Sequence, residues 1–235
     1  AFINSNFDCY LELLDGARLA DEHTKDASWE SNIPVMMALL GVWNTNSLNI
    51  NNHGIFTYNF RLRSLTKYIS QLSMESNGKS INFELKESHF VTSPLIWGGY
   101  GIESQHSTFQ WLMQGKTKTS CDFIGLNNGE TETVDSYEML LSQVLAMTQG
   151  KEDKENLFKS VKGNNPCSIL KIKSIDLRSL GFLIALYEHK VFIEASILDI
   201  DPFDQWGVQL GKKLALEAKT NKKVLEDNFS SSLLP

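Results

Sequence analysis

The chain has 235 residues, of which 42% are hydrophobic and 21% charged, and its formal net charge is −6. These values predict a soluble protein that forms one large domain, or one domain with a helical appendage. The absence of a dense run of Lys or Arg argues against a nucleic-acid partner or an anionic membrane surface. The longest apolar runs, such as IPVMMALLGVW, are too short to span a bilayer.

Cysteine usage argues against a zinc site and favours a reducing compartment. Cys9, Cys121 and Cys167 are far apart, odd in number and outside any CxxC or Cys/His cluster. Lone cysteines are typical of compartments in which disulfides do not form. The expected location is therefore the cytoplasm.

The start of the chain is unusual because it has no initiator Met and lies within apolar sequence. Natural N-termini are usually more polar. We therefore expect the polypeptide to extend upstream. Residues 1–50 are then a helical segment continuing from a missing upstream domain.

Taken in chain order, hydrophobic periodicity and Gly/Pro punctuation predict the following elements. We expect a helix at 7–20, a buried helix at 34–48, a loop at 51–54 (NNHG), an amphipathic helix at 60–74, a strand at 93–101, a helix at 104–116, a buried strand at 119–126, a helix at 134–151, a strand at 167–175, and helices at 177–200 and 204–219. The 60–74 helix is expected to end in a turn that presents Glu75.

Short strands alternating with longer helices indicate an α/β fold with a mainly parallel sheet covered on both faces. We assign this domain to residues 51–216 and a polar C-terminal tail to residues 217–235. Ligands in such folds bind beyond the carboxyl ends of the strands, so WGGYG at 97–101 is a candidate ligand loop.

The local sequence pattern alone identifies few candidate ligand-binding or catalytic side chains. His106 follows the Gly-rich strand end and could meet a ligand, but a packed or surface His is the commoner explanation. Gln205 and Lys212 are seven residues apart, so a single helix would place them on one face, where they could bind sugar oxygens. An amphipathic surface helix explains the same spacing.

The sequence contains neither a complete dinucleotide-binding motif nor a serine-hydrolase motif, and the other histidines give no sign of a role in catalysis. GGYG lacks the rest of a dinucleotide fingerprint, and no GxSxG nucleophile motif occurs. The remaining four histidines occur in polar loops or beside charged residues and are interpreted as structural or surface groups. They are His23, His53, His89 and His189.

Several motifs taken together resemble the phosphoglucose isomerase family. They are MESNGK at 74–79, WGGYGIESQHSTFQWLMQGK at 97–116, CDFIGL at 121–126, GNNP at 163–166, LGFLIALYEHKVF at 180–192 and FDQWGVQLGKKLA at 203–215. Their order and spacing agree with the family from about Phe7 to about Leu216. The resemblance implies two sugar-isomerase (SIS-type) α/β domains, each a three-layer sandwich, of which this chain contains the C-terminal one.

The resemblance also implies interconversion of glucose 6-phosphate and fructose 6-phosphate, without metal or organic cofactor, in a homodimer with shared active sites. Glu75 falls on the family's catalytic carboxylate, His106 on its catalytic His and Lys212 on its catalytic Lys. Gln71 and Gln205 fall on residues that contact substrate. Ring opening needs acid–base groups, and an enediolate step needs one base that moves a proton between C2 and C1.

Three departures from the family pattern are Asn165 for Arg, Gln209 for an acid, and GIESQH for the usual GTNGQH. The family's phosphate loop and its Gly-Gly-Arg signature fall in the preceding half, so this fragment alone is expected to be inactive. Two other interpretations remain. One is a non-catalytic sugar-phosphate-binding SIS module, and the other is a related isomerase that also acts on mannose phosphate.

Overall fold

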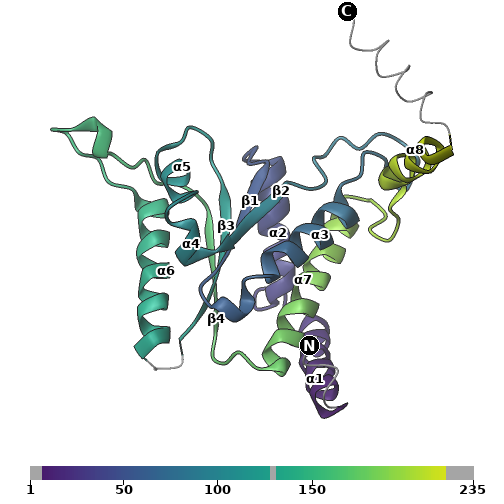
Figure 1. Cartoon of the computed structure of the whole chain (residues 1–235), viewed down its shortest axis with the longest axis horizontal. Coiled ribbons are helices and arrows are strands. Elements are labelled where there is room, and N and C mark those ends of the chain that lie inside the picture. Colours follow the sequence, from purple (N-terminus) through teal and green to yellow (C-terminus); the bar gives the residue numbers. More distant parts are fainter. Residues whose placement is uncertain (1–6, 128–130, 221–235) are drawn as a thin grey trace, which may run out of the picture. The chain divides into compact units, whose positions relative to one another are not determined.

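The computed structural model describes residues 7–127 and 131–220 (Figure 1). These residues form two compact units, the first reaching to Pro202 and the second beginning at Phe203. In chain order the elements are α1 (Phe7–Asp26), α2 (Ile33–Asn46), β1 (Asn52–Thr57), η1 (Phe60–Leu62), α3 (Leu65–Asn77), β2 (Leu95–Tyr100), α4 (Gly101–Ser104), α5 (Phe109–Gln114), β3 (Ser120–Leu126), α6 (Thr131–Gln149), η2 (Leu157–Lys159), β4 (Cys167–Ile172), α7 (Leu177–Ile197), η3 (Trp206–Val208) and α8 (Gln209–Thr220).

The first unit contains a four-stranded parallel sheet in the order β2-β1-β3-β4. The predicted α/β class with a parallel sheet between helices is thus confirmed. The prediction of a loop at 51–54 is wrong, because β1 begins at Asn52 and occupies the middle of the sheet. Asn, His and Gly resemble loop sequence locally, but pairing with β2 brings all three into the sheet, and pairing with β3 as well buries His53 and Gly54.

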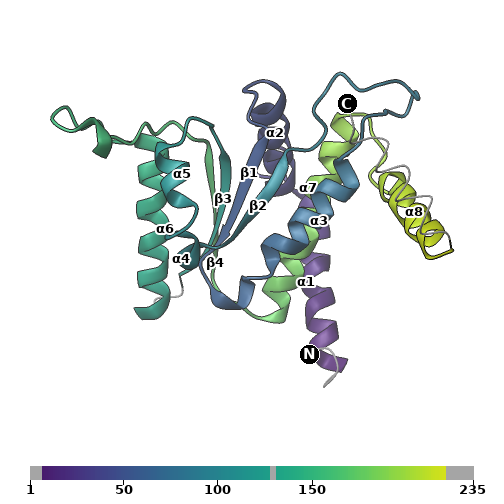
Figure 2. The ribbon, with the colours of Figure 1, turned by 45° about the horizontal axis from the view of Figure 1, so that its top comes forward.

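Helices cover both faces of this sheet (Figures 1 and 2). Alternate residues of a strand point to opposite faces, so Ile55 and Phe56 enter different cores. Ile55 packs with residues of α2, α3 and α7, whereas Phe56 packs with residues of α5 and α6. Helix α1 packs on α7. The unit is therefore a three-layer sandwich with α3 and α7 on one face and α5 and α6 on the other.

Several predicted boundaries shift. The first helix continues past residue 20 to Asp26. The predicted 104–116 helix is shorter than expected, because α4 ends at Ser104 and the helix α5 covers only Phe109–Gln114. The predicted 204–219 helix begins with a 3-10 turn and becomes α-helical only at Gln209. Within the described ranges, no helix has the length and apolar character that crossing a bilayer requires.

The structure describes only the first part of the predicted tail at 217–235. Residues 217–220 belong to α8, and residues 221–235 lie outside the described part of the chain. The boundary between the helical segment and the α/β domain at residues 50 and 51 stays a prediction.

Candidate active site

Glu75 lies in the last turn of α3, so the expectation that a turn presents it is wrong. The helix runs on to Asn77, and the amide of Gly78 donates to Met74 O. Gln71 and Glu75 are one helical turn apart, and Gln71 Nε2 donates to Glu75 Oε2 at 3.0 Å. The carboxylate is half-buried. Two of the five predicted site residues are thus brought into direct contact.

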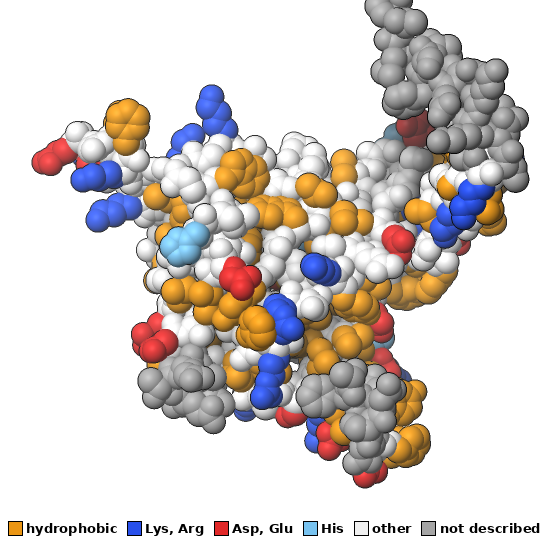
Figure 3. Space-filling model, in the orientation of Figure 1, with side chains coloured by type: hydrophobic (Ala, Val, Ile, Leu, Met, Phe, Trp, Pro, Cys, Tyr) orange, Lys and Arg blue, Asp and Glu red, His pale blue; other side chains and the backbone are white. Residues whose placement is uncertain are grey.

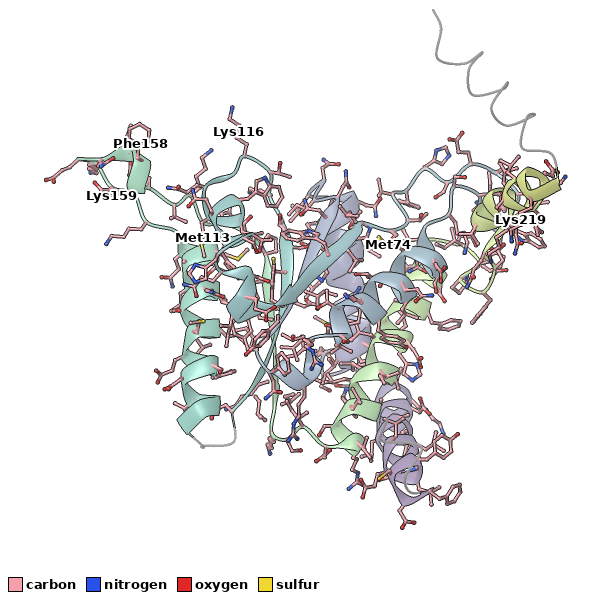
Figure 4. All side chains as sticks on the ribbon, viewed as in Figure 1. Met74, Met113, Lys116, Phe158, Lys159 and Lys219 are labelled. Carbon is pink, nitrogen blue, oxygen red and sulfur yellow. The ribbon has the colours of Figure 1, made fainter. Side chains whose placement is uncertain are left out.

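The helix that carries Glu75 is fixed to its surroundings by side-chain hydrogen bonds. Ser70 Oγ donates to Ile96 O of β2 at 3.2 Å, and buried Asn77 donates from Nδ2 to Val191 O of α7 at 3.1 Å. Met74 marks this end of α3 in Figure 4. The position of the Glu75 backbone is therefore set by both the sheet and α7.

His106 is exposed and lies in the break between α4 and α5. Helix α4 starts directly after β2, where a Cβ on Gly101 would collide with the ring of Tyr58. This close approach requires glycine at that position. His106 thus stands on a short connection beyond the carboxyl end of β2, in the place where ligands of parallel sheets bind.

Within one chain the fold does not bring Glu75 and His106 together. Helix α3 packs on the Ile55 face of the sheet, and α5 packs on the Phe56 face. Met74 and Met113, labelled in Figure 4, lie on these opposite sides. Moreover, α3 returns to the edge where β2 begins, whereas α4 starts at the edge where β2 ends.

Gln205 and Lys212 belong to the second unit, and both are exposed. Gln205 precedes η3, with φ −144° and ψ 42°, and Lys212 lies on α8. The two residues are therefore not on one continuous α-helix, and the shared face expected from their spacing does not form.

The structure contains a buried polar cluster that local pattern analysis missed. His53 Nδ1 lies 2.8 Å from Ser120 Oγ, and His53 Nε2 lies 3.2 Å from Asp122 Oδ2. Tyr187 of α7 donates to Asp122 Oδ2 at 3.1 Å. His53 is therefore structural, as expected, but it lies in β1, one of the two inner strands of the sheet. One feature of the sequence could have revealed this cluster: Asp122 in CDFIGL is an acidic residue within an otherwise apolar strand.

This cluster is buried, and its surroundings favour the carboxylate form of Asp122. Burial disfavours the Asp122 carboxylate, but the facing His53, Lys190 and the Tyr187 hydroxyl outweigh burial and hold its pKa below the usual range. Burial and the Asp122 charge raise the pKa of Tyr187 well above its ordinary value. The deep burial of this Ser, His and Asp is typical of groups that stabilise a core.

Asn165, which departs from the family pattern, has a structural role here. Its Oδ1 accepts from Thr119 N at 3.3 Å, and its backbone N–H donates to Met147 O at 3.0 Å. Gln209 is exposed at the start of α8. Among the described residues, no group of three His, Cys, Asp or Glu side chains could hold a metal ion.

A model of the phosphoglucose isomerase family matches residues 1–233. Glucose-6-phosphate isomerase from Acinetobacter baumannii is 41% identical over 231 residues, covering 88% of this chain and 41% of that protein. The enzyme of the same name from Hydrogenovibrio crunogenus is 39% identical over 250 residues, covering 96% of this chain and 46% of that protein. This chain thus spans less than half the length of these relatives.

The comparison with solved structures finds the same family as the comparison with sequences. A crystal structure of a glucose-6-phosphate isomerase from Chlamydia trachomatis matches with a TM-score of 0.86 and 38% identity, covering 91% of this chain and 43% of that one. A hypothetical protein from Thermus thermophilus shares the fold, with a TM-score of 0.67 at 20% identity, over 88% of this chain and 49% of its own. The match of a family model to nearly the whole chain leads to one conclusion: the chain belongs to the phosphoglucose isomerase family.

Proposed function

We propose that the complete protein is a glucose-6-phosphate isomerase that interconverts glucose 6-phosphate and fructose 6-phosphate in glycolysis and gluconeogenesis. The observation that carries this proposal is the 41% identity, over 88% of the chain, to a relative of that name. The sheet and its covering helices belong to the C-terminal SIS-type domain. Catalysis uses this chain's side chains together with a phosphate loop and an Arg from the preceding half.

Glu75 is the base that moves the proton between C2 and C1. The hydrogen bond from Gln71 orients the carboxylate, and the anchored end of α3 fixes its backbone. A positioned base of this kind accelerates proton transfer about a hundred- to ten-thousand-fold. His106 and Lys212 serve as the acid–base groups of ring opening, while Gln71 and Gln205 contact the sugar.

The working enzyme is a homodimer in which His106 serves the cleft of the partner subunit. The placement of Glu75 and His106 on opposite faces of the sheet supports this, because one chain alone does not join them. On the face seen in Figure 3, the basic side chains are spread over several elements and form no single patch. This face therefore shows no basic patch of the kind that binds nucleic acid. We propose the cytoplasm as the location, supported by the three free cysteines.

The test is an activity assay on the purified complete protein, with Glu75→Gln as the decisive variant. We expect the parent to convert fructose 6-phosphate to glucose 6-phosphate, and the variant to lose at least about a hundredfold in turnover. Calorimetry should still detect fructose 6-phosphate binding to the variant. Glu138→Gln, an exposed change on α6, is the matched control and should match the parent.

Two outcomes would contradict the proposal. A parent that binds fructose 6-phosphate without turnover would favour the non-catalytic SIS module. A variant with turnover within a few-fold of the parent would exclude Glu75 as the base.

A further inference from the structure

The side chain of Lys79 holds three backbone carbonyl groups from two separate segments. Its Nζ donates to Ser76 O at 2.7 Å and to Glu75 O at 3.2 Å, both in the last turn of α3. It also donates to Asp201 O, 122 residues further along the chain, at 3.0 Å. The side chain is half-buried between these groups.

The two contacts with α3 act on the part of the helix that carries Glu75. The last carbonyl groups of a helix have no partner within it and carry a partial negative charge. An ammonium group placed there satisfies the carbonyls and interacts favourably with the helix dipole. Because one of the bound carbonyls belongs to Glu75 itself, Lys79 restrains the backbone from which the proposed base projects.

The backbone of Lys79 is itself held in place by hydrogen bonds, which limits the movement of its side chain. Its backbone N–H donates to Thr92 Oγ1 at 3.2 Å, and the Thr92 hydroxyl donates to Lys79 O at 2.6 Å. The neighbouring Asn77 binds α7 through Val191 O. The segment after α3 is thus tied both to the loop before β2 and to α7.

The third contact reaches the segment that leads into the second unit. Asp201 lies two residues before Phe203, where that unit begins, and the unit carries Gln205 and Lys212. One ammonium group therefore fixes the end of the helix with the proposed base and the start of the connection to the proposed acid–base lysine.

We infer that Lys79 is a positioning residue for proton transfer, which acts through Glu75 by clamping the end of α3 to Asp201. This inference rests on the proposed isomerase function. The carboxylate must reach both C1 and C2, and a displacement of about 1 Å in a catalytic group can cost about a hundredfold in rate. A loss of this anchor should thus appear in turnover more than in substrate affinity.

The experiment compares variants in the complete protein, with fructose 6-phosphate as substrate. We expect Lys79→Met to lower kcat by about a hundredfold while KM changes by less than about threefold. Lys86→Met is the matched control, because Lys86 belongs to the same loop and its ammonium pairs with exposed Glu84 at 2.7 Å. Its kcat and KM should equal those of the parent.

A double variant separates positioning from a general structural role. If Lys79 acts through Glu75, then adding Lys79→Met to Glu75→Gln should lower the residual turnover by less than about threefold, because the group it positions is already disabled. A merely structural lysine would reduce the turnover of Glu75→Gln by the same factor as that of the parent. Equal factors in the two backgrounds would overturn the inference.

Thr92→Val keeps the inference testable if Lys79→Met does not fold. It removes the hydroxyl that holds the Lys79 backbone, and we expect a smaller loss of kcat with the same non-additivity. An inactive parent would refute the proposed function itself. An active parent, an inactive Glu75→Gln and wild-type kinetics in Lys79→Met and Thr92→Val would refute this inference alone.

Discussion

At the scale of single residues, Asp122 in β3 combines burial with contacts to several polar groups. It is almost fully buried, yet it lies 3.2 Å from His53 Nε2 and accepts a hydrogen bond from Tyr187. Lys190, which also lowers the pKa of Asp122, pairs with Glu194 at 2.7 Å. Removal of one partner from such a buried set typically costs about 3–5 kcal/mol, because the others lose their compensation.

We therefore expect Asp122→Asn to lower the free energy of unfolding by about 3 kcal/mol at pH 7. The folded-state pKa of Asp122 lies below its unfolded value, so its contribution is complete above the unfolded pKa of about 3.9 and is lost as the pH falls further. Urea unfolding at pH 7 and near pH 3 should show the difference between parent and variant shrinking at the lower pH. Asp135→Asn, exposed on α6, is the control, and a difference independent of pH would refute the role of the charge.

At the scale of elements, the packing of α1 on α7 depends on two glycines that let the helix backbones approach. A Cβ on Gly16 would collide with the carbonyl oxygen of Arg178, and one on Gly181 would collide with that of Leu13. Ion pairs join the same helices, namely Asp15 with Arg178 and Asp21 with His189, each at 2.7 Å. Since Arg178 and Asp21 are largely exposed, each pair has one partner in water, and close backbone packing contributes more than these pairs.

We expect Gly16→Ala to destabilise the protein by about 2 kcal/mol, because the backbone of α7 cannot move aside as a flexible side chain would. The sign is informative, since Gly to Ala inside a helix otherwise stabilises by about 1 kcal/mol. Denaturant unfolding measures the effect. Gly211→Ala on α8, where a Cβ would meet open space, is the control and should not destabilise. Equal stability of parent and Gly16→Ala would contradict the close packing of α1 on α7.

At the scale of the whole molecule, the central question is how the proposed catalytic groups meet. Glu75 and His106 come from opposite layers of the first unit, and Lys212 comes from the second unit. The proposed homodimer resolves the first separation by letting each His106 serve the Glu75 of the partner.

Subunit mixing tests this arrangement in the complete protein. We expect Glu75→Gln and His106→Ala each to be nearly inactive alone, and a mixture to regain up to about a quarter of the parent activity after subunit exchange. With random exchange half of the dimers are mixed, and each mixed dimer has one cleft with both lesions and one with neither. Exchange is followed by native mass spectrometry. Confirmed exchange without recovered activity would show that each cleft draws both residues from one chain.

The sequence by itself determined the α/β class, most helices and the family, because these rest on local information. Helical periodicity reveals α3, α6 and α7, and an ordered set of motifs identifies the family without any contact map. The five proposed site residues were likewise available from MESNGK, SQHS and FDQWGVQLGKK, with Gln71 just upstream of the first motif. Their roles stay predictions.

Only the tertiary structure decided the features that depend on partners distant in sequence. Strand β1 was missed because Asn52, His53 and Gly54 favour loops, until β2 pairs with all three and β3 pairs with His53 and Gly54. The anchor of Lys79 on Asp201 joins groups 122 residues apart, and no periodicity encodes such a contact. Local propensity reports the neighbours along the chain, whereas burial and long-range hydrogen bonds exist only once the chain has folded.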